Sequence, residues 1–192
     1  MVRLDKIYTK GGDGGQTGLS DGSRISKASL RITAIGAVDE TNSAIGIARL
    51  DAEGDTDAML ARIQNDLFDL GADLSAPEDG RKAPTSQNRG RLRISPAQVE
   101  RLEREIDTMN EKLAPLTSFV LPGGTALAAH LHLARAIARR AEAAMVALAA
   151  EEQINEAALR YANRLSDHLF VMARTANDGG MGDVLWVPGE NR

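Results

Sequence analysis

The sequence predicts an all-α protein, a bundle of five helices that follows a glycine-rich arm. In five segments the apolar residues recur every three or four positions, the spacing that places them on one face of a helix. Alanine and leucine dominate the 43% hydrophobic share of the 192 residues, and both favour helices. The six glycines between Gly11 and Gly22 exclude a helix there, since each costs about 1 kcal/mol relative to alanine.

The five helices are expected at about residues 30–50, 59–76, 96–114, 125–150 and 155–177. The third has the clearest start, because Ser95 can cap it, Pro96 suits its first turn and Gln98 completes a capping box. An alanine-rich stripe along the fourth helix indicates close approach to another helix or a subunit interface.

We expect a single domain over residues 1–192, with an arm at 1–28, a helical bundle at 30–177 and an extended tail at 178–192. Short extended segments are expected at residues 6–9 and 184–187, and a polar surface loop at about residues 77–93.

Composition excludes several classes of protein. Without cysteine the chain has no disulfides, thiolate metal sites or cysteine nucleophile. A net charge of −4 and 3% aromatic residues argue against a nucleic-acid partner. No run of about 18 apolar residues predicts a membrane span, and the first ten residues do not resemble a secretory signal. We therefore expect a cytoplasmic protein with no membrane partner.

The glycine-rich arm is a candidate anion site. It is neither a P-loop nor a dinucleotide fingerprint, because no Gly-Lys-Ser/Thr follows the glycines and no βαβ unit surrounds them. However, glycines let backbone N–H groups approach a phosphate closely, and Lys10, Arg24 and Lys27 place positive charge nearby. A mobile arm without a ligand is the alternative interpretation.

The fourth helix places Arg135, Arg139 and Glu142 on one face, whereas Arg140 points elsewhere. Two guanidinium groups one turn apart suit a polyphosphate, although a ladder of surface ion pairs is the alternative. On the last helix, Asn163 offers an amide to a ligand or to polar packing between helices. The histidines form no Glu-x-x-His or His-Glu-x-x-His motif, and we interpret them as packing or surface residues.

Four segments follow one another along the chain: YTKGGDGGQT at residues 8–17 with Lys27 beyond it, AVDETNSAIG at 37–46, FVLPGG at 119–124 leading to ARAIARRAE at 134–142, and NRLSDHLF at 163–170. Together they resemble the PduO-type ATP:cob(I)alamin adenosyltransferases over nearly the whole chain. This resemblance implies a five-helix bundle that forms a homotrimer, with ATP bound between neighbouring subunits. It also implies that cob(I)alamin, or a cob(I)yrinic acid derivative, attacks C5′ of ATP with the help of Mg²⁺, giving adenosylcobalamin and triphosphate.

The resemblance assigns roles to individual residues. The ATP-binding residues that it implies are Thr9, Lys10, Gly11, Gly12, Thr17, Gly18, Lys27, Arg139, Arg140, Glu142 and Asn163. It implies that Arg135 pairs with Asp39 to hold the site together, and that Arg139 acts on the triphosphate. Phe119 would lie at the lower face of the corrin and displace the dimethylbenzimidazole base.

The chain departs from the family pattern at Thr41 in the second segment, at Gly11, and at Ala143, where an arginine is common. Loss of that arginine removes one phosphate contact. Two alternatives to the enzyme are a protein that binds ATP or adenosylcobalamin without catalysis, and a helical scaffold with a disordered basic arm. The protein partner expected of the enzyme is a corrinoid reductase or a B12-dependent acceptor enzyme.

Overall fold

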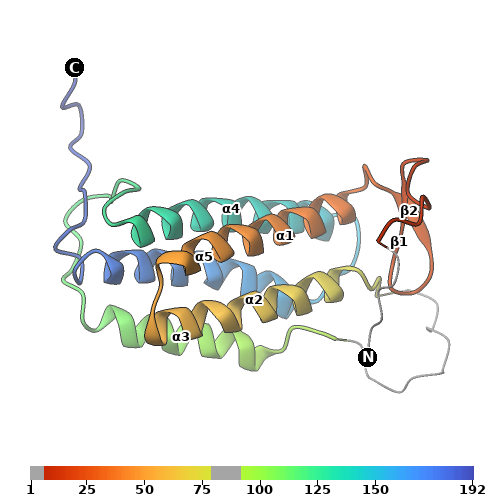
Figure 1. The fold of residues 1–192 in the computed structure, drawn as a ribbon, viewed down its shortest axis with the longest axis horizontal. Coiled ribbons are helices and arrows are strands. Elements are labelled where there is room, and N and C mark those ends of the chain that lie inside the picture. Colours follow the sequence, from red (N-terminus) through yellow and green to blue (C-terminus); the bar gives the residue numbers. More distant parts are fainter. Residues whose placement is uncertain (1–6, 79–91) are drawn as a thin grey trace.

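The computed structural model describes residues 7–78 and 92–192 of the chain. Within these residues five helices lie side by side as a bundle: α1 (Leu30–Ala48), α2 (Gly54–Leu74), α3 (Pro96–Asn110), α4 (Ala126–Ala149) and α5 (Glu156–Ala176) (Figure 1). A short 3₁₀ turn, η1 (Arg49–Asp51), follows α1. The predicted all-α class and its five helices are confirmed. None of the described helices is both long and apolar enough to cross a bilayer.

Side-chain caps fix where the helices begin. Ser95 and Gln98 form the expected capping box at the start of α3, with Pro96 in its first turn. Thr125 accepts a hydrogen bond from the backbone N–H of Ala128 at the start of α4. Each cap satisfies backbone N–H groups that have no partner inside the helix. The ends were harder to predict: α3 stops at Asn110, before Pro115, and α2 begins at Gly54, ahead of its first large apolar residue.

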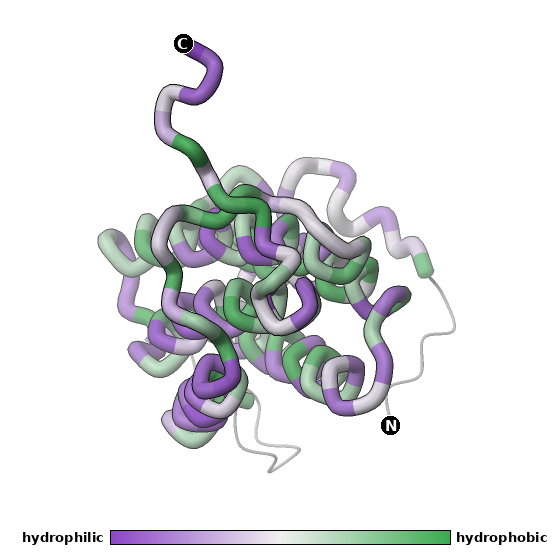
Figure 2. Tube along the Cα trace, turned by 90° about the vertical axis from the view of Figure 1, so that its left-hand side faces the viewer, coloured by the Kyte–Doolittle hydropathy of each residue, from purple (hydrophilic) through white to green (hydrophobic). Residues whose placement is uncertain are grey.

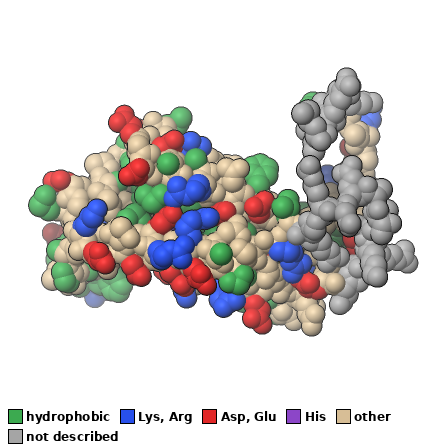
Figure 3. All heavy atoms as spheres, turned by 90° about the horizontal axis from the view of Figure 1, so that it is seen from below, with side chains coloured by type: hydrophobic (Ala, Val, Ile, Leu, Met, Phe, Trp, Pro, Cys, Tyr) green, Lys and Arg blue, Asp and Glu red, His purple; other side chains and the backbone are tan. Residues whose placement is uncertain are grey.

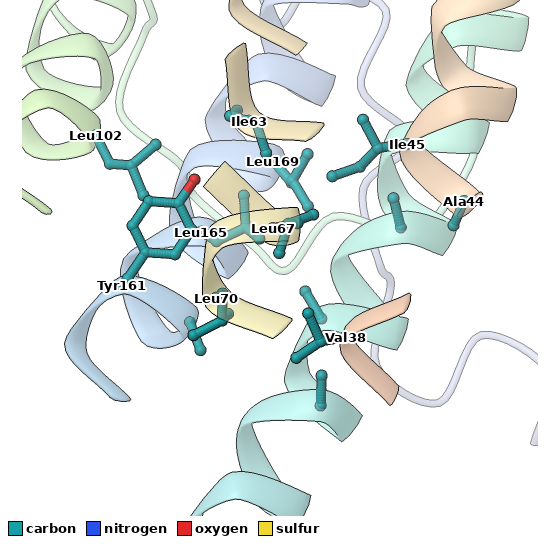
Figure 4. Close-up of a cluster of buried hydrophobic side chains, with 14 of the residues drawn as sticks. Val38, Ala44, Ile45, Ile63, Leu67, Leu70, Leu102, Tyr161, Leu165 and Leu169 are labelled. Carbon is teal, nitrogen blue, oxygen red and sulfur yellow. The ribbon is translucent and has the colours of Figure 1, made fainter. Parts of the chain in front are cut away.

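The helices pack in the order α2, α1, α4, α5, α3, each against the next. Large apolar side chains from all five helices form the core, and Figure 4 shows part of it, with Val38, Ile45, Leu67, Tyr161 and Leu165 among its members. Small residues on α4 let it approach α1 closely, since Ala134, Ala138 and Ala141 are all buried. The alanine stripe is therefore part of the core.

The arm differs from the predicted loop, because it contains a two-stranded antiparallel hairpin, β1 (Gln16–Gly18) and β2 (Arg24–Ser26), at one end of the bundle (Figure 1). Thr17 lies opposite Ile25. The strands are too short for periodicity to detect, and one of the three paired positions of β1 is a glycine, Gly18 opposite Arg24. At the tip Gly22 has φ +86°, which favours glycine, and Asp21 accepts the backbone N–H of Ser23 at 2.9 Å. The extended segment expected at residues 6–9 begins outside the described residues, and residues 7–9 form no strand.

The tail leaves the bundle at the opposite end from the hairpin (Figures 1 and 2). Its expected extended segment forms a β-bridge between Leu185 and Val120, and the backbone N–H of Trp186 donates to the carbonyl of Phe119 at 2.8 Å. Asn177 holds the adjoining turn by accepting the backbone N–H of Thr125 at 3.0 Å. Backbone hydrogen bonds from the tail therefore hold the loop that carries Phe119. Most of the polar loop expected at residues 77–93 lies outside the described residues.

Candidate active site

The arm is built around three cations and the glycine backbone. Arg24 donates hydrogen bonds to the carbonyls of Gly11 and Gln16, the latter at 3.2 Å, which folds the loop back on the hairpin. Lys27 lies so close to Gly12 that a Cβ there would come within 2.9 Å of its Nζ. Lys10 adopts φ +58°, an uncommon backbone conformation for a residue with a side chain. The fold therefore brings an ammonium group and a glycine backbone together, as an anion site requires.

A cavity of about 620 Å³ lies between the hairpin, α1 and α2. Thr17 and Lys27 of the arm line it together with Asp39 of α1. The hairpin is tied to the end of α2, because the backbone N–H and the hydroxyl of Ser20 donate to the carbonyl of Ser75 at 3.1 and 2.9 Å. We call Thr17, Lys27, Asp39 and this cavity the arm half of the site.

The predicted face of α4 lies beside α5. Glu142 accepts a hydrogen bond from the Asn163 amide at 2.7 Å, so two expected ATP-binding residues lie together. Arg139 is exposed and forms no ion pair with any described residue. Arg140 points to the other side of α4 and pairs with Glu40 of α1. The helical spacing predicted this separation of Arg139 from Arg140.

A second cavity, of about 450 Å³, brings Phe119 and Arg135 together with Phe170 of α5. The Arg135 guanidinium lies over the Phe170 ring, with Cζ 5.8 Å from the ring centre. Burial lowers the pKa of Arg135, and the charge of Arg139 lowers it further. Phe119 is 76% exposed and packs against Trp186, the ring centres being 5.9 Å apart. We call this cavity with Arg139, Glu142 and Asn163 the Arg135 half.

The expected pair between Arg135 and Asp39 does not form within the chain. Asp39 lies in the arm half, and the buried Nε of Arg135 has no hydrogen-bond partner in the part of the chain that the structure describes. The packed pair of α1 and α4 separates the two groups, because Asp39 faces the α2 side of α1 and Arg135 faces the α5 side of α4. Helical spacing gives a residue's face but not its distance from another helix, so it could not test this contact.

Sequence reasoning assigned no role to Phe170 or Trp186. Phe170 closes the NRLSDHLF segment, but the segment does not reveal that its ring contacts Arg135. Trp186 is the single tryptophan of the chain, and only the folded tail places it against Phe119. The three histidines pack as expected: His132 and His168 are buried, and His130 contacts Asp51 at 3.0 Å.

Comparison with known proteins identifies the family. The sequence profile described as cobalamin adenosyltransferase matches residues 7–176. The chain belongs to the cobalamin adenosyltransferase family. It is 50% identical to the corrinoid adenosyltransferase of Mycobacterium leprae over 98% of both chains, and 49% identical to the cobalamin adenosyltransferase of Cupriavidus metallidurans over 96% and 95% of the two chains.

Solved structures agree with this membership. A variant of the PduO-type ATP:corrinoid adenosyltransferase from Lactobacillus reuteri, complexed with cobalamin and ATP, has a TM-score of 0.82 and 39% sequence identity. The similarity covers 94% of this chain and 99% of that one. The predicted corrinoid adenosyltransferase is thereby confirmed, and the scaffold without enzymatic activity is excluded as an interpretation. The individual roles of the site residues stay predictions.

Proposed function

We propose that this member of the cobalamin adenosyltransferase family transfers the 5′-deoxyadenosyl group of ATP to the cobalt of cob(I)alamin, using the arm half and the Arg135 half together. The cavity shared by Phe119, Arg135 and Phe170 carries this proposal, because it joins an apolar surface for a corrin to the cationic face of α4. The family match and the ligands of the solved relative support it.

The arm half would wrap the nucleotide. Lys27 and the glycine backbone offer positive charge and N–H groups to the triphosphate, and Lys10 and Thr17 lie on the same short hairpin arm. Thr9, Gly11, Gly12 and Gly18 are the remaining arm residues of the proposed site. From the helices, Arg139 is free to bind a phosphate in a bidentate manner, and the Glu142–Asn163 pair would contact the nucleoside.

Two copies of the chain are needed for one complete site. The hairpin lies at one end of the bundle and Phe119 lies at the other, beside the tail (Figure 1). A neighbouring copy would bring its arm half to the Arg135 half of the first, where Asp39 would pair with Arg135 across the interface. Exposed apolar side chains on α1 and α4, Ile47, Leu133 and Val146, support burial against another copy. We propose that the chain forms a closed ring in which each copy has one complete site, and the family resemblance favours a homotrimer.

The proposed reaction needs a nucleophile at C5′ of ATP and positive charge beside the leaving triphosphate. Cob(I) is itself the nucleophile, so attack on C5′ forms the cobalt–carbon bond while the C5′–oxygen bond breaks and triphosphate leaves. No general base is required. Lys27 and Arg139 would stabilise the charge that develops on the leaving triphosphate. Phe119 would cover the lower face of the corrin, because an aromatic surface keeps a nitrogen base or water from the cobalt.

Mg²⁺ would enter as part of the co-substrate MgATP. No group of three or more histidine or acidic side chains that could hold a metal occurs among residues 7–78 and 92–192. This fits Mg²⁺, which is commonly held by substrate phosphates and water with few protein ligands.

The deciding experiment follows cob(I)alamin anaerobically by its absorption spectrum after MgATP is added to the protein. We expect the cob(I) bands to give way to a photolabile alkylcobalamin, with one triphosphate released for each cobalt–carbon bond. Binding of ATP without this conversion would support the non-catalytic carrier instead. The partners that we propose, a corrinoid reductase and a B12-dependent acceptor enzyme in the cytoplasm, would supply cob(I) and take the product.

A second experiment tests the arm. ATP should protect the bonds after Lys10 and Lys27 from trypsin, because the arm would fold over the nucleotide. Cleavage at the same rate with and without ATP would remove the arm from the site.

A further inference from the structure

His132 is a buried residue with no assigned role. Its side chain is on α4, one turn before Arg135, and is 1% exposed. Neither ring nitrogen has a hydrogen-bond partner among the described residues. A buried imidazole without partners is costly, since its polar atoms lose their bonds to water. A second buried polar atom without a partner, Nε of Arg135, lies on the same helix.

The contacts of His132 lead to the corrinoid cavity. Its ring meets the Phe170 ring edge-on, with ring centres 6.2 Å apart. The Phe170 ring in turn lies beneath the Arg135 guanidinium. Phe170 and Arg135 both line the cavity with Phe119, whereas His132 does not. The histidine therefore contacts the wall of the cavity from behind.

We propose that neutral His132 is a positioning residue for the corrinoid cavity: its ring supports Phe170, which holds the Arg135 guanidinium at the cavity wall. The inference rests on the proposed function, because it takes the cavity of Phe119, Arg135 and Phe170 as the corrinoid site. An imidazole suits this position, since its edge packs against an aromatic ring and its neutral form adds no charge beside Arg135.

Protonation would disturb this arrangement. Burial lowers the pKa of His132, and the charge of Arg135 on the same helix lowers it further, while Asp183 of the tail raises it by a smaller amount. Asp183 is already bound to Arg174 at 2.7 Å. Phe170, which packs against the ring from α5, carries no charge. In acid a second cation would appear beside Arg135 and weaken the stack on Phe170.

The experiment measures cob(II)alamin binding in the presence of ATP by quenching of Trp186, the single tryptophan, which contacts Phe119. At pH 7.5 we expect His132→Ala to weaken cob(II)alamin binding about tenfold, with the KM for ATP unchanged. His132→Phe keeps an aromatic edge against Phe170 and should bind nearly as tightly as the unmodified chain.

The pH dependence of cob(II)alamin binding tests whether the neutral imidazole of His132 holds Phe170 in place or the ring only fills space. Because the pKa of His132 is lowered from its ordinary 6.5, the unmodified protein should keep its affinity at pH 6.5 and lose it only as the pH falls further below that value. His132→Phe should show no such loss, because phenylalanine takes up no proton. His130→Phe is the matched control, since His130 lies two residues away, contacts Asp51 and should leave the acid-dependent loss in place.

Three outcomes would contradict the proposal. Tight binding by His132→Ala at pH 7.5 would show that Phe170 needs no support. An acid-dependent loss retained in His132→Phe would assign the titration to another group. If Phe119→Ala also binds cob(II)alamin normally, the cavity is not the corrinoid site, and the proposed site fails together with this inference. If Phe119→Ala binds weakly while His132→Ala binds normally, only the inference about His132 is rejected.

Discussion

Two charged groups with buried polar atoms, Asp66 on the α2–α3 side of the bundle and Arg135 on the α4–α5 face beside Phe119, differ in whether those atoms have partners. Between α2 and α3, the buried carboxylate of Asp66 accepts hydrogen bonds from Gln98 and Tyr161, both at 2.9 Å, and pairs with Arg101. Basic and acidic side chains are mixed over this face of the molecule (Figure 3). On the α4–α5 face, Arg135 and His132 have buried polar atoms without partners.

This difference distinguishes scaffold from site. A satisfied buried charge fixes the helices relative to one another, and it would cost several kcal/mol to break. Nε of Arg135 has no partner among the described residues, so a ligand or a second copy could offset the cost of burying it. Oδ1 of Asn42, which lines the arm cavity, and Nδ1 of His168, outside the proposed site, are also buried without partners in the described part of the chain. Substitutions in each region test this division between scaffold and site.

The largest expected effect is on the scaffold side. Asp66→Ala should lower the free energy of unfolding by about 3 kcal/mol, because it leaves the buried Tyr161 hydroxyl and the Arg101 guanidinium without their acceptor. Denaturant titration measures this loss, and turnover per folded molecule should stay the same. Asp69→Ala, on the same helix, is the control and should change stability little. A similar loss in both variants would show that the hydrogen-bonded cluster has no special role.

On the site side we expect a large loss of turnover and little loss of stability. Arg139→Ala should reduce turnover by on the order of 100-fold, since one charge-assisted contact with the leaving triphosphate is lost, while stability hardly changes. Steady-state kinetics with cob(I)alamin and MgATP measure the effect, and the exposed Arg160→Ala on α5 serves as the control. Near-normal turnover in Arg139→Ala would remove this arginine from the site.

The proposed pair across the interface should give an intermediate effect. Asp39→Ala is expected to lower activity about tenfold by freeing Arg135 of the neighbouring copy. A double-mutant cycle with Arg135→Ala decides whether the two side chains act on each other, because a real pair gives losses that do not add. Additive losses would mean that Asp39 and Arg135 act separately, as they do within one chain.

The smallest effect concerns acid stability on the scaffold side. Burial alone would raise the pKa of Glu105, but hydrogen bonds from His168 and Arg62, with their charges, lower it overall below its ordinary 4.5. The unfolded chain then takes up the proton first, so stability present above pH 4.5 is lost as the pH falls further. Glu105→Gln should remove this part of the acid sensitivity, less than about 1 kcal/mol. Thermal unfolding between pH 6 and 3 measures it, and a pH dependence in Glu105→Gln that is unchanged, and equal to that of the exposed Glu103→Gln, would contradict the assignment.

The local patterns of the chain predicted much of the scaffold. Helix existence followed from apolar spacing, and the start of α3 followed from Ser95 and Gln98, because caps and periodicity are properties of neighbouring residues. The hairpin was missed because three-residue strands have too little periodicity and the surrounding glycines indicate only a loop. Contacts such as Phe170 with Arg135 or His132 join different helices, and no local pattern encodes their distance.

By itself the sequence determined the helical class, the helix faces and the set of residues that resemble the adenosyltransferase motifs. Only the tertiary structure decided how that set divides: Thr17, Lys27 and Asp39 in one cavity, Phe119 and Arg135 in another. The physical reason is that a helix face depends on spacing along one segment, whereas a cavity depends on how several helices pack. Packing the small residues of α4 against α1 placed the two halves of the site on different sides of the bundle.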